Sequence, residues 1–172
     1  AQSNAKDFVN TLYDALSAEN NSGSSGDNLT PGEDNPSGQF PEAIDLSSSE
    51  PSNCYVLSTS GVYKFKTVQG NSNSSVGSVA RAEVLWESFG TDVAPSVGDL
   101  IKSVSYDDGY IAFETADDFK EGNAVIAALD RSENIVWSWH IWFTDPPKSQ
   151  VYYNNAGTMM DRNLGATSAA PG

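Results

Sequence analysis

The chain has 172 residues, enough for one domain of ordinary size with flanking segments. Its 23 acidic and 9 basic residues give a formal net charge of -14 at pH 7. Because nucleic-acid binding needs clustered Lys and Arg to neutralise phosphates, this charge balance argues against a nucleic-acid partner, and it also disfavours binding to anionic lipid. No apolar run approaches the roughly 20 residues needed to cross a bilayer, so we expect no membrane-spanning segment.

The first 52 residues differ in composition from the rest. Apolar side chains recur at helical spacing near the N-terminus and predict a short amphipathic helix over residues 5–18, within a segment 1–19: Phe8, Val9, Leu12, Tyr13 and Leu16. Such a short helix is marginal in water, so it docks on another surface, is disordered, or belongs to a preceding domain. Residues 20–52 are rich in Asn, Ser, Gly, Asp and Pro and predict a flexible, disordered-type linker.

From Cys54 onward, short apolar segments alternate with turn residues, as in an all-β domain. Ser60-Gly61 predicts a hairpin between strands at 54–59 and 62–68. The segment 79–87 predicts a half-buried strand with Trp86 facing the core, because Ala80, Ala82, Val84 and Trp86 alternate with Arg81, Glu83, Leu85 and Glu87.

Two further hairpins follow in the chain. Asp107-Asp108-Gly109 connects predicted strands at 100–106 and 110–115, and residues 130–133 connect strands at 123–129 and 134–144. After Pro146-Pro147, which cannot continue a ladder, a last strand at 150–153 leads through a polar turn to residues 158–164.

The segment from Ile135 to Phe143 carries three of the four tryptophans and the single histidine. With the period of a strand, one face is wholly apolar: Trp137, Trp139, Ile141 and Phe143. The other face is mixed: Val136, Ser138, His140 and Trp142. This pattern is typical of a central strand in a layered β-protein. It predicts a core built from the apolar face of this segment together with Val84, Trp86, Ile111, Phe113, Val125 and Tyr63 or Phe65.

We therefore expect an all-β fold, an immunoglobulin-like β-sandwich of about seven to nine antiparallel strands with a flexible N-terminal segment. The predicted domain spans residues 53–164, and residues 165–172 form a tail that leads toward a further C-terminal region.

Several motifs resemble large surface lipoproteins and fimbrillin-like adhesins of gut Bacteroidetes. The resemblance covers about residues 53–166 and rests on Asn53-Cys54-Tyr55, Tyr63-Lys64-Phe65, Ala82–Gly90, Glu121–Ala127, Trp137-Ser138-Trp139-His140-Ile141-Trp142 and Met159-Met160-Asp161-Arg162-Asn163-Leu164-Gly165-Ala166. It implies an extracellular location at the outer-membrane surface, adhesion or pilus association, and no known chemistry. In that family the last motif opens a further C-terminal domain.

His140 and Trp142 are the candidate ligand-binding residues, because an aromatic ring beside a polar group can stack on a sugar. The pattern favours the alternative, a second buried layer over a strand that is covered on both faces. The single Cys54 excludes an internal disulfide and is expected to be a buried apolar thiol. An ion pair between Asp161 and Arg162 is expected to be structural.

No catalytic group, metal ligand set or cofactor site is predicted. One His and one Cys cannot supply a zinc site, and the pairs Asp107-Asp108 and Asp117-Asp118 fall short of the about 6–8 oxygens that calcium needs. We expect a non-catalytic adhesion or pilus-associated module that binds a protein partner or a host or glycan surface, with strand exchange between neighbouring subunits. A carbohydrate-binding module that uses exposed tryptophans is the alternative.

Overall fold

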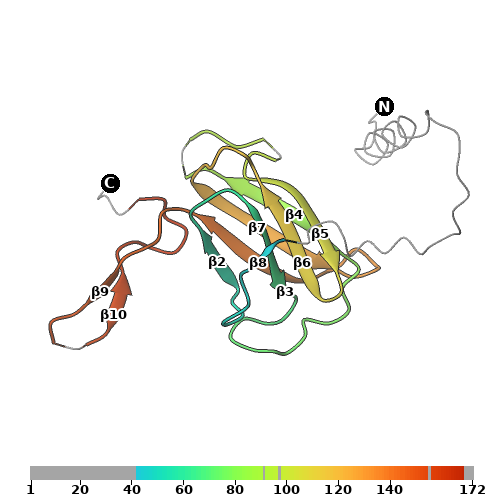
Figure 1. Ribbon diagram of the computed structural model, residues 1–172, viewed down its shortest axis with the longest axis horizontal. Coiled ribbons are helices and arrows are strands. Elements are labelled where there is room, and N and C mark those ends of the chain that lie inside the picture. The colour runs from blue at the N-terminus through green and yellow to red at the C-terminus, as the bar shows by residue number, and fades with distance from the viewer. Residues whose placement is uncertain (1–41, 91, 97, 155, 169–172) are drawn as a thin grey trace, which may run out of the picture. The chain divides into compact units, whose positions relative to one another are not determined.

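Ten strands run through the residues that the computed structural model describes, which are 42–90, 92–96, 98–154 and 156–168 (Figure 1). They are β1 (Ile44–Asp45), β2 (Cys54–Leu57), β3 (Val62–Lys66), β4 (Arg81–Ser88), β5 (Ile101–Asp107), β6 (Tyr110–Thr115), β7 (Gly122–Leu129), β8 (Ile135–Phe143), β9 (Ser149–Val151) and β10 (Thr158–Met160). No helix occurs within these ranges, so the all-β prediction is confirmed for them. The helix predicted over residues 5–18 lies outside the described residues.

Eight strands form two four-stranded sheets, and β9 and β10 form a separate hairpin. Sheet A has the order β1-β3-β6-β5, and sheet B has the order β2-β8-β7-β4. Both sheets are mixed, because β1 pairs with β3 and β2 pairs with β8 in parallel. The prediction of purely antiparallel strands is therefore wrong at these two edges, where the chain reaches each sheet through a crossover instead of a hairpin.

Aromatic rings fill the space between sheets A and B. The Phe65 ring of sheet A lies 5.1 Å from the Trp139 ring of sheet B, and it also stacks on Tyr55 of sheet B. The predicted inner face of β8 is confirmed: Trp139, Ile141 and Phe143 are buried in this core, and Trp137 packs at its margin. Two sheets that are each amphipathic thus bury their apolar faces against one another.

Trp86 does not face the core as predicted. A bulge in β4 lies at Leu85, so that Val84 pairs with Ile126 while Trp86 pairs with Val125. The extra residue inverts the alternation of the strand and turns Trp86 to the outer face of sheet B, where half of it is exposed. Val125, also predicted in the core, lies on the same outer face because it pairs with His140, while its neighbours Ala124 and Ile126 on β7 face the core.

The hairpin predicted at Ser60-Gly61 does not form. β2 belongs to sheet B and β3 to sheet A, so this turn carries the chain from one layer to the other. Because the chain crosses between the sheets at this point, Leu57 and Tyr63 lie on different sheets and are both buried in the core between them. The other two predicted hairpins are confirmed as β5–β6 and β7–β8.

The domain begins before residue 53, within the predicted linker. β1 pairs with β3, Leu46 packs against the core, and the buried Ser47 accepts a hydrogen bond from the Lys66 amide through its hydroxyl oxygen. These contacts hold residues 44–47 on sheet A. The prediction of a disordered-type linker thus does not apply to its last residues.

Replacing Trp139 by Ala is expected to lower the free energy of unfolding by about 3–5 kcal/mol, because the ring is fully buried between the sheets. Trp86→Ala is the matched control and is expected to change stability by less than about 0.5 kcal/mol, since its ring is half exposed. Denaturant unfolding followed by circular dichroism measures both. Similar losses for the two variants would contradict the assignment of faces.

Candidate functional site

Residues 161–168, here called the strap, lie on the outer face of sheet B. The Asn123 side chain on β7 donates a hydrogen bond from Nδ2 to the Gly165 carbonyl at 3.0 Å, and Trp142 on β8 donates from Nε1 to the Ala166 carbonyl at 3.2 Å. A Cβ atom on Gly90 would lie 3.1 Å from Thr167 Oγ1, so the strap also contacts the end of β4 closely. The predicted tail from residue 165 is thus part of the domain as far as it is described.

Arg162 anchors the beginning of the strap. Its guanidinium donates to Asp161, to both carboxylate oxygens of Asp145 and to the hydroxyl of Thr144, and only 5% of the side chain is exposed. The expected ion pair between Asp161 and Arg162 is present, at 2.9 Å from Nε to Oδ1. This forked arrangement fixes the strap to the end of β8.

Trp142, a predicted ligand-binding residue, is fully buried beneath the strap. Its indole nitrogen is already bonded to the Ala166 carbonyl, and no ring face is open to solvent. The prediction that Trp142 stacks on a sugar is therefore wrong for this conformation. The alternative, a second buried layer over β8, describes it correctly.

His140, the second predicted residue, is half-buried and bonded through both ring nitrogens. The parallel pairing of β2 with β8 places Cys54 directly beside it, with Cys54 Sγ 3.3 Å from His140 Nδ1. On the other side, His140 Nε2 lies 2.8 Å from Asn123 Oδ1. Cys54, His140 and Asn123 thus form one hydrogen-bonded row across three neighbouring strands, here called the thiol row.

The strap fixes the direction of the hydrogen bonds in the thiol row. Because the Gly165 carbonyl can only accept, the Asn123 amide must turn its NH₂ toward Gly165 and its oxygen toward His140. His140 then donates from Nε2, which leaves Nδ1 unprotonated. The remaining nitrogen is therefore placed to accept the thiol proton of Cys54.

Burial keeps this pair uncharged. It raises the pKa of Cys54 from its ordinary value of 9.0 to about 11, and it lowers the pKa of His140 below its usual value. Both shifts disfavour the thiolate and the imidazolium. The thiol row in this state is a structural hydrogen-bond chain and lacks the activated nucleophile of a cysteine enzyme.

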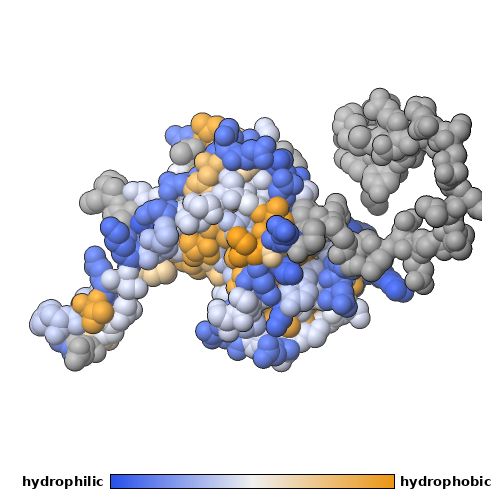
Figure 2. All heavy atoms as spheres, in the orientation of Figure 1, coloured by the Kyte–Doolittle hydropathy of each residue, from blue (hydrophilic) through white to orange (hydrophobic). Residues whose placement is uncertain are grey.

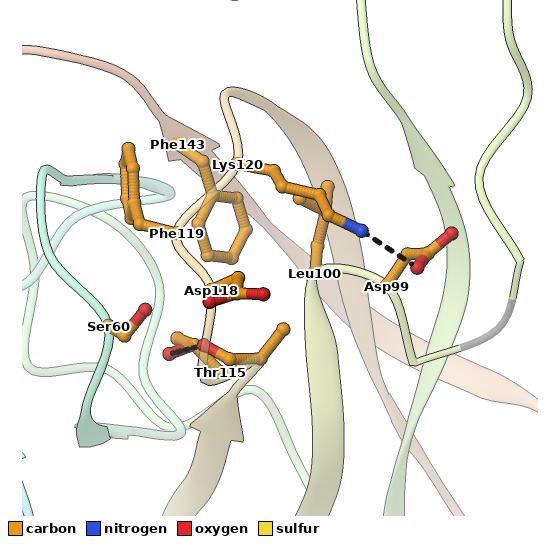
Figure 3. A pocket seen from close by; sticks show the side chains of 9 residues that line it. Ser60, Asp99, Leu100, Thr115, Asp118, Phe119, Lys120 and Phe143 are labelled. Carbon is orange, nitrogen blue, oxygen red and sulfur yellow. Dashed lines mark hydrogen bonds and ion pairs between the residues drawn. The ribbon is translucent and has the colours of Figure 1, made fainter.

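Cavities elsewhere give no stronger candidate. The pocket in Figure 3 lies between the crossover at Ser60, Leu100 and the segment 116–120, and Phe119 and Phe143 close it so that it leaves no room for a water-sized ligand. An open groove of about 540 Å³ lies beside Tyr106 and Arg131, with a mostly polar lining. Within the described ranges, no three residues among His, Cys, Asp and Glu are grouped to hold a metal ion.

The β9–β10 hairpin exposes an unusual amount of apolar surface. Figure 1 shows it as a separate element, and Figure 2 shows apolar side chains on it. Its exposed large side chains are Val151, Tyr152, Tyr153, Met159 and Met160, with Tyr153 at 98%. Among the residues with described structure, no helix has the length and apolar character needed to cross a membrane.

Comparison with protein-family models, with curated proteins and with solved structures gave no match for this chain. The site therefore rests on its own geometry. Sequence reasoning missed the thiol row because Cys54 and His140 are 86 residues apart and meet only through a parallel edge pairing. The one available signal was that each occupies a strand segment.

Acid is expected to release the strap, and Arg162→Gln to remove this pH dependence. Arg162 lowers the pKa of Asp145 and of Asp161, so its stabilising effect is complete above the ordinary carboxyl pKa and is lost as pH falls below that value. Hydrogen exchange of strap amides, corrected for intrinsic rates, is expected to lose protection between about pH 5 and pH 3. Amides of β7 are the internal control. Equal protection of the strap at both pH values would contradict the role of Arg162.

Proposed function

We propose that the chain is an immunoglobulin-like β-sandwich module, non-catalytic and extracellular, with an adhesion or pilus-associated role at the outer-membrane surface. The resemblance of several motifs to those of fimbrillin-like adhesins supports this proposal. So does the pairing of two four-stranded layers around one aromatic core, an architecture that often carries binding surfaces on loops and edges. The uncharged state of the thiol row is consistent with a module without chemistry.

The exposed apolar β9–β10 hairpin carries the proposal. A two-stranded hairpin by itself is at best marginally stable in water, and it normally needs a third strand or a packing surface. β9 and β10 pair only with each other among the described strands. The hairpin therefore has a free strand edge and apolar faces that a partner would cover.

A second copy of the chain is the partner that the hairpin fits best. Residues 149–160 contain no charged side chain, although the whole chain has a net charge of -14. Natural edge strands usually carry charges or proline that prevent pairing with another edge, and neither occurs here between residues 149 and 160. Edge-to-edge pairing of two hairpins joins the neighbouring subunits through uncharged segments, so the repulsion between their negative charges is smallest there.

Introducing lysine at Val151 and Met160 together is expected to abolish self-association. Both side chains are exposed on one face of the hairpin, so the change adds like charges to the contact and leaves the core intact. Sedimentation velocity over a range of concentrations measures the association. The matched control is Ile135→Lys, another exposed apolar position, which is expected to associate as the unaltered chain does. A monomeric unaltered chain at all concentrations would contradict the proposal.

Carbohydrate binding is a second candidate, and the half-exposed Trp86 favours it. The bulge at Leu85 places this ring on the outer face of sheet B, beside Val125 and in line with His140. A flat, partly exposed indole on a rigid strand suits stacking against a sugar ring.

If Trp86 binds glycans, Trp86→Ala is expected to weaken binding about tenfold, which corresponds to the roughly 1.4 kcal/mol of one aromatic contact. A glycan array identifies the ligand, and titration calorimetry measures the affinity. The control Leu85→Ala removes the neighbouring exposed side chain and is expected to have a smaller effect. An array without binding, or equal affinity in both variants, excludes this role of Trp86.

A further inference from the structure

The thiol row has a composition and an order of hydrogen bonds that the proposed binding function does not use. The single thiol of the chain points its proton at His140 Nδ1, and Asn123 holds the opposite ring nitrogen. A base in contact with a thiol and oriented by an amide is the arrangement that generates a nucleophilic sulfur. The same Asn123 is bonded to the strap through Gly165.

The strap covers this arrangement closely. A Cβ atom on Gly165 would lie 3.2 Å from Asn123 Oδ1 and 3.7 Å from His140 Cε1. The strap backbone therefore lies directly on His140 and Asn123, two members of the thiol row. Its attachments to sheet B include two hydrogen bonds to its backbone carbonyls, from Asn123 and from Trp142. Opening of the strap breaks these bonds and uncovers Trp142 but leaves the aromatic core between the two sheets packed, so it requires less free energy than unfolding of the domain.

We propose that Cys54, His140 and Asn123 form a thiol site that the strap keeps closed, and that Cys54 forms a mixed disulfide with a small disulfide-containing molecule once residues 163–167 leave sheet B. Cys54 and His140 meet the reacting atoms in this site. Asn123 is a positioning residue, because it acts by orienting the His140 ring.

The exchange is balanced without any additional oxidant. The Cys54 sulfur attacks one sulfur of the disulfide while its proton passes to His140 Nδ1. The S–S bond of the molecule breaks, a new S–S bond forms to Cys54, and the other half leaves as a thiolate that is protonated by His140 or solvent. Because the chain has one cysteine, the mixed disulfide cannot rearrange into an internal one.

Strap opening is expected to increase the intrinsic reactivity of Cys54 about tenfold, in addition to any easier access of the disulfide to the sulfur. Hydration would return the pKa of the thiol from about 11 toward 9.0, which raises the thiolate fraction about 100-fold at neutral pH. The intrinsic nucleophilicity of a thiolate falls as its pKa falls, and this reduces the 100-fold gain about tenfold. The strap thus acts on the thiol through His140 and Asn123, the two residues that Gly165 contacts.

The test follows mixed-disulfide formation on the full chain with oxidised glutathione, measured as the increase in intact mass over time. Gly165→Val opens the strap, because its φ of 85° and the contact with Asn123 both exclude a branched side chain. Gly157→Val is the matched control, since its φ is also positive but a Cβ there meets no atom within 4 Å. Cys54→Ser confirms the modified residue.

The unaltered chain and Gly157→Val are expected to react slowly, and Gly165→Val at least about tenfold faster. Adding His140→Gln to Gly165→Val is expected to remove most of this gain and to shift the pH profile of the rate toward that of an ordinary thiol, an effect that a merely structural role of His140 would not produce. The proposal is overturned if Gly165→Val reacts at the rate of its control, or if His140→Gln leaves both rate and pH profile unchanged. Should near-ultraviolet circular dichroism show that Gly165→Val unfolds the domain, Arg162→Gln replaces it with the same expectations.

Discussion

Burial of β8 on both faces is the constraint on which the rest of the structure depends. Its inner face carries Trp139, Ile141 and Phe143 into the aromatic core, and its outer face carries Trp142, which is also fully buried. A strand of this kind must be central, so it needs a neighbour on each side and a cover on each face. β2 and β7 are the neighbours, and sheet A and the strap are the covers.

The chemistry of the two covers differs because the two faces of β8 differ. The inner face is apolar and is matched by rings, although the indole nitrogen of Trp139 has no hydrogen-bond partner among the described residues. The outer face of β8 presents the indole N–H group of Trp142. His140 on the same face binds the oxygen of the Asn123 amide, which leaves the NH₂ group of Asn123 pointing outward, so the cover must supply acceptors. The strap supplies two backbone carbonyls, and Gly165, without a side chain and at positive φ, lets that backbone approach the sheet.

The sequence predicted those parts of the fold that depend on local periodicity. The alternation of β8 and the turn residues at 107–109 and 130–133 identified the central strand and two hairpins, because a two-residue period and turn chemistry are encoded locally. The bulge at Leu85 was not predictable, since one extra residue leaves the composition of a strand unchanged. The crossover at Ser60-Gly61 resembles a hairpin turn locally, and only the competition between the two sheets for β2 and β3 decides its path. For the site, the pattern placed His140 and Trp142 on one face correctly, but their shared cover and the contact with Cys54 arise from segments distant in sequence.

The hairpin and the strap are connected through one side chain. The β9–β10 hairpin is an excursion of the chain between Asp145 and Asp161, and Arg162 binds both of these carboxylates. The Asp161 amide also donates to the Lys148 carbonyl, which closes the base of the hairpin. A displacement of the hairpin base therefore acts on Arg162, and Arg162 is the first fixed point of the strap. For this reason the base of the exposed apolar hairpin and the strap that lies over the thiol row share the ion pairs of Arg162.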